Sequence, residues 1–156
     1  MNNQMIKEIL DSSIKESIAR LILNDLEEWF GMPEYTKEYI ENSNSMPFFA
    51  AYDHKEAVAF ISLKETSKYT AEIYCMGVLK KYHRKGIGRK LFYAFEAYAI
   101  KNGYKFLQVK TVEEGKYDSY DLTNAFYKSL GFYELEVFPK MWDEWNPCQI
   151  LIKSIQ

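Results

Sequence analysis

The sequence is poor in the residues that build metal centres and disulfide frameworks. Its 156 residues include two histidines and two cysteines, and Cys75 and Cys148 lie too far apart to form a CxxC pair. Metal clusters and redox motifs need such residues at close spacing. We therefore predict no metal cofactor, and we expect both cysteines to be buried apolar residues rather than ligands or nucleophiles.

Long apolar segments are absent as well. No stretch approaches the roughly 18 to 20 consecutive apolar residues that a membrane span needs. The first residues, MNNQMIKEIL, lack the apolar core of a secretory signal. The protein is therefore expected to be cytoplasmic and not to contact a membrane. Its length is that of one ordinary domain, so we predict a single domain over residues 1–156.

The net charge is small, but positive charge is concentrated in one place. The net charge is −2, yet the segment Lys80–Lys90, KKYHRKGIGRK, contains six of the 20 basic residues and no acidic residue. The rest of the chain has 14 basic and 22 acidic residues, a net charge of −8. A nucleic-acid partner would call for a larger positive surface and is not expected. One compact cationic segment favours a small polyanion instead.

Apolar spacing, with glycine and proline as breaks, divides the chain into short strands and helices. Strands are predicted at Gln4–Leu10, Phe48–Tyr52, Ala57–Leu63, Ala71–Leu79, Lys105–Thr111, Phe132–Phe138 and Gln149–Ile155. Helices are predicted from a capping box of Ser13 and Glu16 to Gly31, from Pro33 to about residues 42–45, from Ile87 to Asn102, and from Asp121 to Leu130. Gly103 and Gly131 are expected to end the last two helices. The inward side of the last helix is predicted to consist of Leu122, Ala125, Phe126 and Leu130.

This order of elements predicts a mixed sheet covered by helices. The strand, turn, helix and strand between Ala71 and Thr111 have the length of one βαβ crossover, which makes its two strands parallel. The two strands that close the chain follow each other as a hairpin and are expected to be antiparallel.

The strongest chemical signal is the turn that opens the predicted helix at Ile87. It consists of His83, Arg84, Lys85, Gly86, Ile87, Gly88 and Arg89. Free N–H groups at a helix start, glycines that allow close approach and neighbouring cations together favour a phosphate ligand, best a pyrophosphate. The spacing GxxxxGK[ST] is absent, and Leu91 stands where GxGxxG needs its last glycine. A nucleotide triphosphatase or a dinucleotide oxidoreductase is therefore disfavoured.

These residues resemble the GCN5-related N-acetyltransferase (GNAT) superfamily, whose acyl-CoA pyrophosphate loop has the pattern [QR]xxGx[GA]. Here His83 stands in place of glutamine or arginine, followed by Gly86 and Gly88. Asn124–Phe132, NAFYKSLGF, resembles the second signature of the family. The resemblance implies an α/β (α+β) fold, with a mixed, mostly antiparallel sheet of about six to seven strands flanked by helices on both faces. It also implies acetyl-CoA as cosubstrate.

The resemblance further assigns roles to four residues. The main chain of Met76 and Val78 is expected to bind pantetheine and the thioester oxygen, as an oxyanion hole does. Tyr127 is expected to protonate the thiolate of CoA as it leaves, although a half-buried packing tyrosine is the alternative. Asn124 is expected to contact pantetheine or the carbonyl-bearing end of CoA, although capping of its own helix is also plausible.

Glu72 is the candidate base. It stands fourteen positions before Gly86, the spacing at which similar histone acetyltransferases place a catalytic glutamate. Strand alternation predicts Glu72, Tyr74, Met76 and Val78 on one face of their strand. That placement suits a catalytic role, but it equally suits a solvated strand start, and a chain of water molecules is an alternative base.

Aromatic and acidic residues in two loops are candidates for the acceptor site, because a cationic amine suits aromatic faces and carboxylates. The candidates are Trp29, Tyr35, Trp142 and Glu144, with Phe30, Met32, Asp143 and Trp145 beside them. A satellite core or a dimer contact would explain the same aromatics. The resemblance also makes a homodimer possible.

The predicted function is direct acetyl transfer from acetyl-CoA to a primary amine of a small molecule or peptide. The charge of −8 outside the basic segment favours a cationic acceptor. The identity of the amine and the length of the acyl group stay open. The alternative is a non-catalytic acyl-CoA-binding regulatory module.

Overall fold

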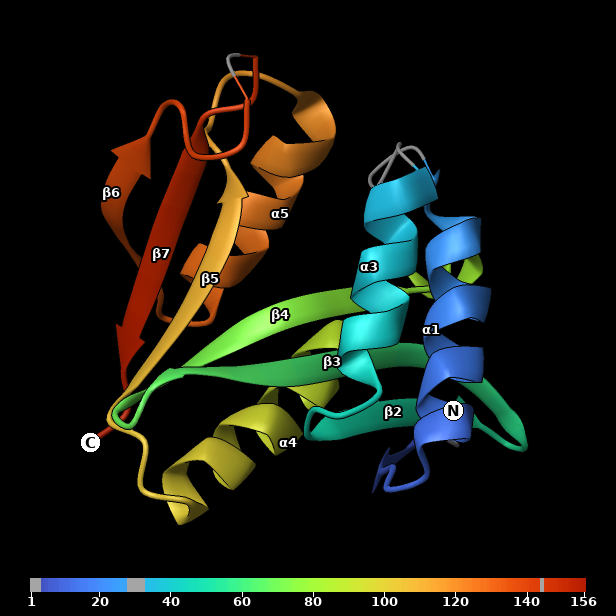
Figure 1. The fold of residues 1–156 in the computed structure, drawn as a ribbon. Helices are drawn as coiled ribbons and strands as arrows, with labels where there is room; N and C mark the ends of the chain where they lie inside the picture. Colours follow the sequence, from blue (N-terminus) through green and yellow to red (C-terminus); the bar gives the residue numbers. More distant parts are fainter. Residues whose placement is uncertain (1–3, 28–32, 144) are drawn as a thin grey trace.

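A computed structural model describes residues 4–27, 33–143 and 145–156 (Figure 1). The strands are β1 (Gln4–Glu8), β2 (Phe48–Asp53), β3 (Glu56–Ser67), β4 (Thr70–Val78), β5 (Phe106–Val112), β6 (Tyr133–Phe138) and β7 (Cys148–Ser154). The helices are α1 (Ser12–Asp25), α3 (Pro33–Ser43), the short 3-10 helix η1 (Lys80–Tyr82), α4 (Ile87–Lys101) and α5 (Asp118–Ser129).

The strands form one seven-stranded sheet in the order β1-β2-β3-β4-β5-β7-β6. Among the described strand pairs, β4 and β5 are parallel and the others are antiparallel. The predicted crossover and the closing hairpin are therefore confirmed. In Figure 1, α1 and α3 lie side by side on one face of the sheet, and α4 lies on the other. The predicted mixed, mostly antiparallel sheet with helices on both faces is confirmed.

Two apolar clusters explain why this arrangement holds together. One lies between the sheet and α4, and it includes Tyr127 of α5 and Leu130, which follows that helix. The other lies between the sheet and α1 with α3. Along β2, Phe48 faces the second cluster and Phe49 the first. Burial on both faces is the reason that β2 and β3 are continuous apolar runs rather than alternating ones.

The first helix begins earlier than predicted. Asp11 is its N-cap, and the Asp11 carboxylate accepts a hydrogen bond of 3.1 Å from the Ile14 N–H. The predicted capping box of Ser13 and Glu16 is therefore wrong, because an aspartate two residues earlier is the N-cap and accepts from the Ile14 N–H. The Glu16 carboxylate instead accepts from the Asn44 amide. The helix ends at Asp25, and its predicted end, Gly31, lies outside the described residues.

The last helix also departs from its prediction. α5 begins three residues earlier, at Asp118, and Leu122 is 65% exposed. Ala125 is exposed too, so the predicted inward stripe is wrong at both positions. Leu130 is buried as predicted, and the other buried residues are Asn124 and Tyr127. A polar residue faces inward because the end of β5 offers it hydrogen-bond partners, a contact that apolar spacing does not reveal.

Glycines end the two helices as predicted. Gly103 follows α4 with a φ of 85°, and Gly131 follows α5 with a φ of 101°. Both angles are in the left-handed region, which glycine occupies without steric cost. Among the described residues, no helix is long and apolar enough to cross a membrane.

Candidate active site

The central feature of the site is the separation of β4 from β5. The two strands pair only from Thr70 to Ile73 and from Phe106 to Val109. Beyond these residues β4 continues to Val78 and β5 to Val112 without pairing to each other. Figure 1 shows the two strands diverging from their paired ends. Main-chain groups on the facing edges of both strands are therefore not used by the sheet.

A β-bulge in β4 determines which side chains face this opening. Ser62 of β3 pairs with Cys75, but the next residue, Leu63, pairs with Ile73, so Tyr74 is an extra residue in β4. A bulge inverts the alternation of the residues that follow it. Met76 accordingly packs against the α4 cluster together with Ile73, whereas Tyr74 packs against the α1 and α3 cluster.

The predicted common face of Glu72, Tyr74, Met76 and Val78 is therefore wrong. Met76 and Val78 lie on the α4 side of the sheet. Tyr74 lies on the opposite side, and so does Glu72, because its neighbours Ala71 and Ile73 both point to α4. The expectation missed this because strand alternation holds only as far as the next bulge.

The backbone of β4 after the bulge points main-chain donors toward the opening. The Leu79 N–H donates to the Val58 carbonyl of β3 at 2.9 Å. Backbone groups alternate between the two edges of a strand, so those of Val78 and Met76 point away from β3. The Val78 carbonyl accepts a hydrogen bond of 2.7 Å from the His83 Nε2–H. The main-chain groups of Met76 and Val78 thus lie on the side where they would have to be to bind pantetheine and the thioester oxygen, as predicted for them.

The basic turn leads directly into α4. Gly86 is the N-cap of this helix, with a φ of 79°, and no side chain caps it. The first turn contains no acidic residue. The start of a 15-residue helix therefore presents N–H groups and partial positive charge, and its own first turn has no carboxylate to compete for them. This is an environment that suits phosphate oxygens.

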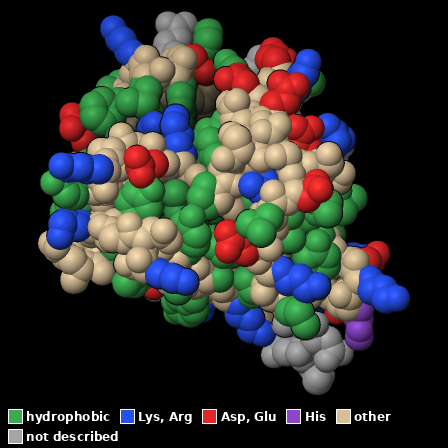
Figure 2. All heavy atoms as spheres, turned by 60° about the horizontal axis from the view of Figure 1, so that its bottom comes forward, with side chains coloured by type: hydrophobic (Ala, Val, Ile, Leu, Met, Phe, Trp, Pro, Cys, Tyr) green, Lys and Arg blue, Asp and Glu red, His purple; other side chains and the backbone are tan. Residues whose placement is uncertain are grey.

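The side chains of the turn are divided between the solvent and the protein. Arg84 and Lys85 are exposed, whereas the side chain of Ile87 is in the core. Arg89 donates to the Ser129 hydroxyl of α5 at 2.9 Å. Figure 2 shows Lys and Arg side chains over the left and lower parts of the face that it presents, and Asp and Glu most densely at its upper right.

Gly88 marks the place where the turn, β4 and α5 meet. A Cβ atom at this position would lie 3.4 Å from Cζ of Phe126 and 3.5 Å from Cε of Met76. Both distances are ordinary van der Waals contacts. The first turn of α4 is thus next to β4 after its bulge and to the residue that precedes Tyr127.

Tyr127 projects from α5 into the core. It is 7% exposed, and its ring packs edge-on against Phe132 with centroids 5.7 Å apart. Burial raises the pKa of the Tyr127 phenol well above its ordinary value, and Cys75 and Tyr120 raise it further. The phenol is therefore protonated at any physiological pH. Within the described part of the chain, no hydrogen-bond partner is found for its hydroxyl, although buried hydroxyls usually have one.

Asn124 lies one turn before Tyr127 and ties α5 to the end of β5. Its side chain is fully buried. The amide nitrogen donates to the Val112 carbonyl at 3.0 Å, and the amide oxygen accepts from the Thr111 hydroxyl at 2.6 Å. These bonds fix the helix that presents Tyr127. The predicted contact of Asn124 with CoA stays a prediction.

Glu72 lies on the other side of the sheet, where β4 and β5 are still paired. It is 4% exposed. Its Oε1 atom accepts from the Gln108 amide at 2.6 Å and lies 3.3 Å from Nζ of Lys110. Sequence analysis missed both partners. The predicted parallel pairing of these strands could have pointed to them. Gln108 is opposite Glu72 in the register, and Lys110 is two residues further along the same face of β5.

Three partly buried tyrosines, Tyr39, Tyr74 and Tyr120, were also missed. The rings of Tyr39 and Tyr74 meet edge to face, with centroids 5.2 Å apart. Burial raises the pKa of Tyr39, and Cys75, Tyr74, Tyr120 and Glu72 raise it further. Burial likewise raises the pKa of Tyr120. The three tyrosines come from three separate elements, and nothing in their local sequence links them.

The predicted acceptor residues are only partly covered by the structure. Trp29 and Glu144 lie outside the described residues, as do Phe30 and Met32. Tyr35, in the first turn of α3, and Trp142, in the loop between β6 and β7, are both partly exposed. Asp143 shapes this loop, because its carboxylate accepts from the N–H groups of Trp145 and Asn146. A role in acceptor binding stays a prediction for these residues.

Comparison with known protein families decides the assignment. The model of the acetyltransferase (GNAT) family matches residues 15–132, which is more than half of the chain. The chain belongs to this family. The resemblance that the basic turn and the motif around Tyr127 suggested is therefore confirmed, and so is acetyltransferase membership. No curated protein sequence matches the chain.

Solved structures of GNAT proteins share the fold across nearly the whole chain. Ard1 from Thermoplasma volcanium has a TM-score of 0.79 at 17% identity and covers 99% of each chain. A GNAT acetyltransferase from Elizabethkingia anophelis, with acetyl-CoA bound, has a TM-score of 0.74 at 19% identity and covers 99% of this chain and 100% of its own. The ribosomal-protein-S18-alanine N-acetyltransferase from Escherichia coli has a TM-score of 0.75 at 19% identity, with 98% and 94% coverage. At these identities the likeness concerns the fold.

Proposed function

We propose that the protein is an acetyl-CoA-dependent N-acetyltransferase that moves the acetyl group directly to a primary amine of a small molecule or peptide. The observation that carries the proposal is the buried, protonated hydroxyl of Tyr127, for which the described chain offers no hydrogen-bond partner. It lies on the helix next to the unpaired part of β4, in a chain of the GNAT family.

The residues of the basic turn fit the polyanionic end of acetyl-CoA. The main-chain N–H groups at the start of α4, from Gly86 to Arg89, would take the pyrophosphate, because no protein side chain caps them. The exposed cations Arg84 and Lys85 add charge-assisted contacts. His83 contributes indirectly, because its ring donates a hydrogen bond to the Val78 carbonyl of β4. Acetyl-CoA supplies an activated acyl thioester, and the chemistry requires no metal.

The main chain of β4 after the bulge serves the reacting carbonyl. The N–H groups of Met76 and Val78 point toward the side that β5 leaves open, where they can donate to a thioester oxygen that gains negative charge. Donors that are fixed before the reaction contribute about 3 to 4 kcal/mol each to such a step.

Tyr127 supplies the proton for the leaving sulfur. The amine nitrogen forms a bond to the acyl carbon, the carbon–sulfur bond breaks, and the thiolate takes the proton of the phenol. The raised pKa of Tyr127 keeps that proton in place until negative charge develops on sulfur. Solvent, or the proton that the amine releases, restores the phenol. Asn124 contributes by fixing α5 on β5.

Glu72 serves the amine side of the reaction. Tyr39 and Tyr74 lie on the same side of the sheet as Glu72, and burial together with its carboxylate raises the pKa of both phenols. Aromatic rings and a carboxylate on one side of the sheet suit a cationic amine. Both contacts from Gln108 and Lys110 go to Oε1. Glu72 thus holds the ammonium group or takes its proton, and a water chain is the alternative base. These groups, with the net charge of −8 outside the basic segment, support a cationic acceptor rather than a nucleic acid.

The experiment that tests the proposal is release of CoA thiol in the presence of a panel of amines. The panel should include polyamines, aminoglycosides and peptides with a free N-terminus. We expect turnover with at least one cationic amine and a loss of roughly 100-fold or more in kcat for Tyr127→Phe. Tyr104→Phe is a matched control, because the Tyr104 hydroxyl donates to Glu65 on the surface. Binding of acetyl-CoA without turnover of any amine would instead support the regulatory module.

A further inference from the structure

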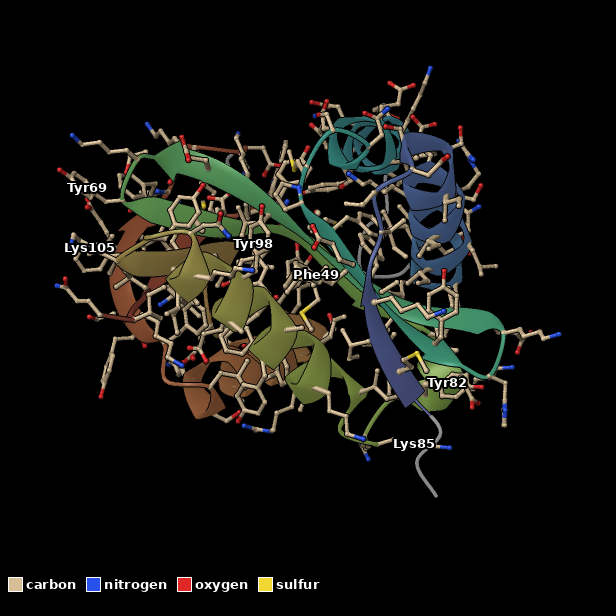
Figure 3. All side chains as sticks on the ribbon, turned by 90° about the horizontal axis from the view of Figure 1, so that it is seen from below. Phe49, Tyr69, Tyr82, Lys85, Tyr98 and Lys105 are labelled. Atoms are coloured by element: carbon tan, nitrogen blue, oxygen red, sulfur yellow. The ribbon has the colours of Figure 1, made fainter. Side chains whose placement is uncertain are left out.

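Tyr82 stands between the end of β4 and the basic turn, and its ring contacts two cations, Lys85 of that turn and Lys81 before it. Nζ of Lys85 lies 5.7 Å from the centroid of the Tyr82 ring, and Nζ of Lys81 lies 5.5 Å from it. Figure 3 shows the side chains of Tyr82 and Lys85 next to each other. Both distances are within the range in which an ammonium group is attracted to an aromatic face.

The ring itself is held by a second contact. The Tyr82 hydroxyl donates to the Asp53 carboxylate, at the end of β2, at 2.6 Å. A hydrogen bond to an ionised acceptor at this distance is a strong one. Asp53 is the last residue of β2, so the ring is anchored to the sheet.

The main chain on both sides of Tyr82 is fixed as well. The Lys80 N–H donates to the Asp25 carboxylate, at the end of α1, at 2.8 Å. The His83 ring donates to the Val78 carbonyl at 2.7 Å. Tyr82 is therefore a rigid support at the base of an otherwise exposed, cationic segment.

Rigid support of a lysine has a definite consequence for ligand binding. A lysine side chain has four rotatable bonds, and ordering it on a ligand costs conformational entropy. A ring that holds the ammonium group near its binding position before the ligand arrives reduces this cost. We propose that Tyr82, anchored by Asp53, positions Lys85 for the phosphate groups of CoA. The proposal rests on the proposed function, since it takes acetyl-CoA as the cosubstrate.

The test is a double-mutant cycle on the affinity for CoA, measured by calorimetric titration. We expect Lys85→Gln to weaken CoA binding about fivefold to tenfold, which corresponds to about 1 to 1.4 kcal/mol of binding free energy. Tyr82→Leu should weaken it by nearly as much, and the double variant should bind no more weakly than Lys85→Gln alone. Tyr82→Phe keeps the ring but loses the bond to Asp53, so its loss should be smaller than that of Tyr82→Leu.

Salt dependence separates positioning from a general effect on folding. The slope of log Kd against log salt concentration reports the cation–phosphate contacts. It should fall by the same amount in Tyr82→Leu and in Lys85→Gln. Tyr69→Leu is the matched control, because Nζ of Lys68 lies 5.0 Å from the Tyr69 ring, away from the turn (Figure 3). That variant should bind CoA as the wild type does.

Two results would overturn the proposal for Tyr82 and leave the proposed function intact. One is an unchanged CoA affinity in Tyr82→Leu. The other is a double variant in which the affinity losses of the two single variants add fully. If Tyr82→Leu does not fold, the same comparison is made with Tyr82→Phe and Asp53→Asn, each combined with Lys85→Gln. A wild-type protein that does not bind CoA would overturn the proposed function together with this one.

Discussion

Replacing Tyr127 with phenylalanine should change stability and activity in opposite directions. The hydroxyl is buried on a side chain that is 7% exposed, and the described chain provides no partner for it. A buried hydroxyl without a hydrogen bond costs about 1 to 3 kcal/mol. Tyr127→Phe removes this cost and retains the ring contact with Phe132. We therefore expect the free energy of unfolding to rise by about 1 to 3 kcal/mol.

For a chain of this size, each kcal/mol corresponds to a change of roughly 2 to 4 °C in Tm. The rise should be measured by thermal and by denaturant unfolding at neutral pH without ligand. In the same preparation, kcat for amine acetylation should fall by roughly 100-fold or more, because the leaving thiolate loses its proton donor. If Tyr127 served only packing, the variant would lose stability and keep its kcat.

Tyr104→Phe calibrates both measurements. Its hydroxyl donates to the Glu65 carboxylate at 2.5 Å on the surface, so losing it should lower stability slightly and leave kcat unchanged. The reasoning is refuted if Tyr127→Phe loses more than about 1 kcal/mol of stability while kcat is retained. That result would mean that the hydroxyl serves the fold.

Three further predictions concern the fold and the amine side of the site. Gly77→Ala should lower the free energy of unfolding by about 1 to 3 kcal/mol in denaturant titrations, because its Cβ would lie 2.9 Å from Ile22 and 3.0 Å from Leu26. Above pH 9, stability should fall with rising pH, because burial raises the pKa of the Cys75 thiol. The unfolded chain then releases a proton that the folded chain retains, and Cys75→Ala should reduce the slope by about 1.4 kcal/mol per pH unit. Glu72→Gln should lower kcat/KM for the amine about tenfold or more and leave the Kd for acetyl-CoA unchanged in titrations, whereas unchanged amine kinetics would remove Glu72 from the mechanism.

Most of the order of elements could be predicted from the sequence, because glycine, proline and apolar spacing act locally. Gly103 and Gly131 end their helices where expected, and the single crossover is parallel as expected. The basic turn was found for the same reason, since its residues are contiguous.

The parts that could not be predicted depend on partners far apart in the sequence. The bulge at Tyr74 comes from the register of β4 against β3, and it moves Met76 and Glu72 to opposite faces. The inward position of Asn124 depends on acceptors at the end of β5. In the same way, Lys110 reaches Glu72 only because two strands pair. Local periodicity contains none of these contacts.

The most direct test of the central claim is a calorimetric titration of the protein with acetyl-CoA at two salt concentrations, with Arg84→Glu alongside. The account predicts saturable binding to the wild type that weakens at high salt and in the variant, because the turn is an exposed cationic site. With a Kd of about 10 μM, ligand near 1 mM should also stabilise the fold by roughly 2.7 kcal/mol. No heat of binding and no thermal stabilisation at that concentration would contradict the account.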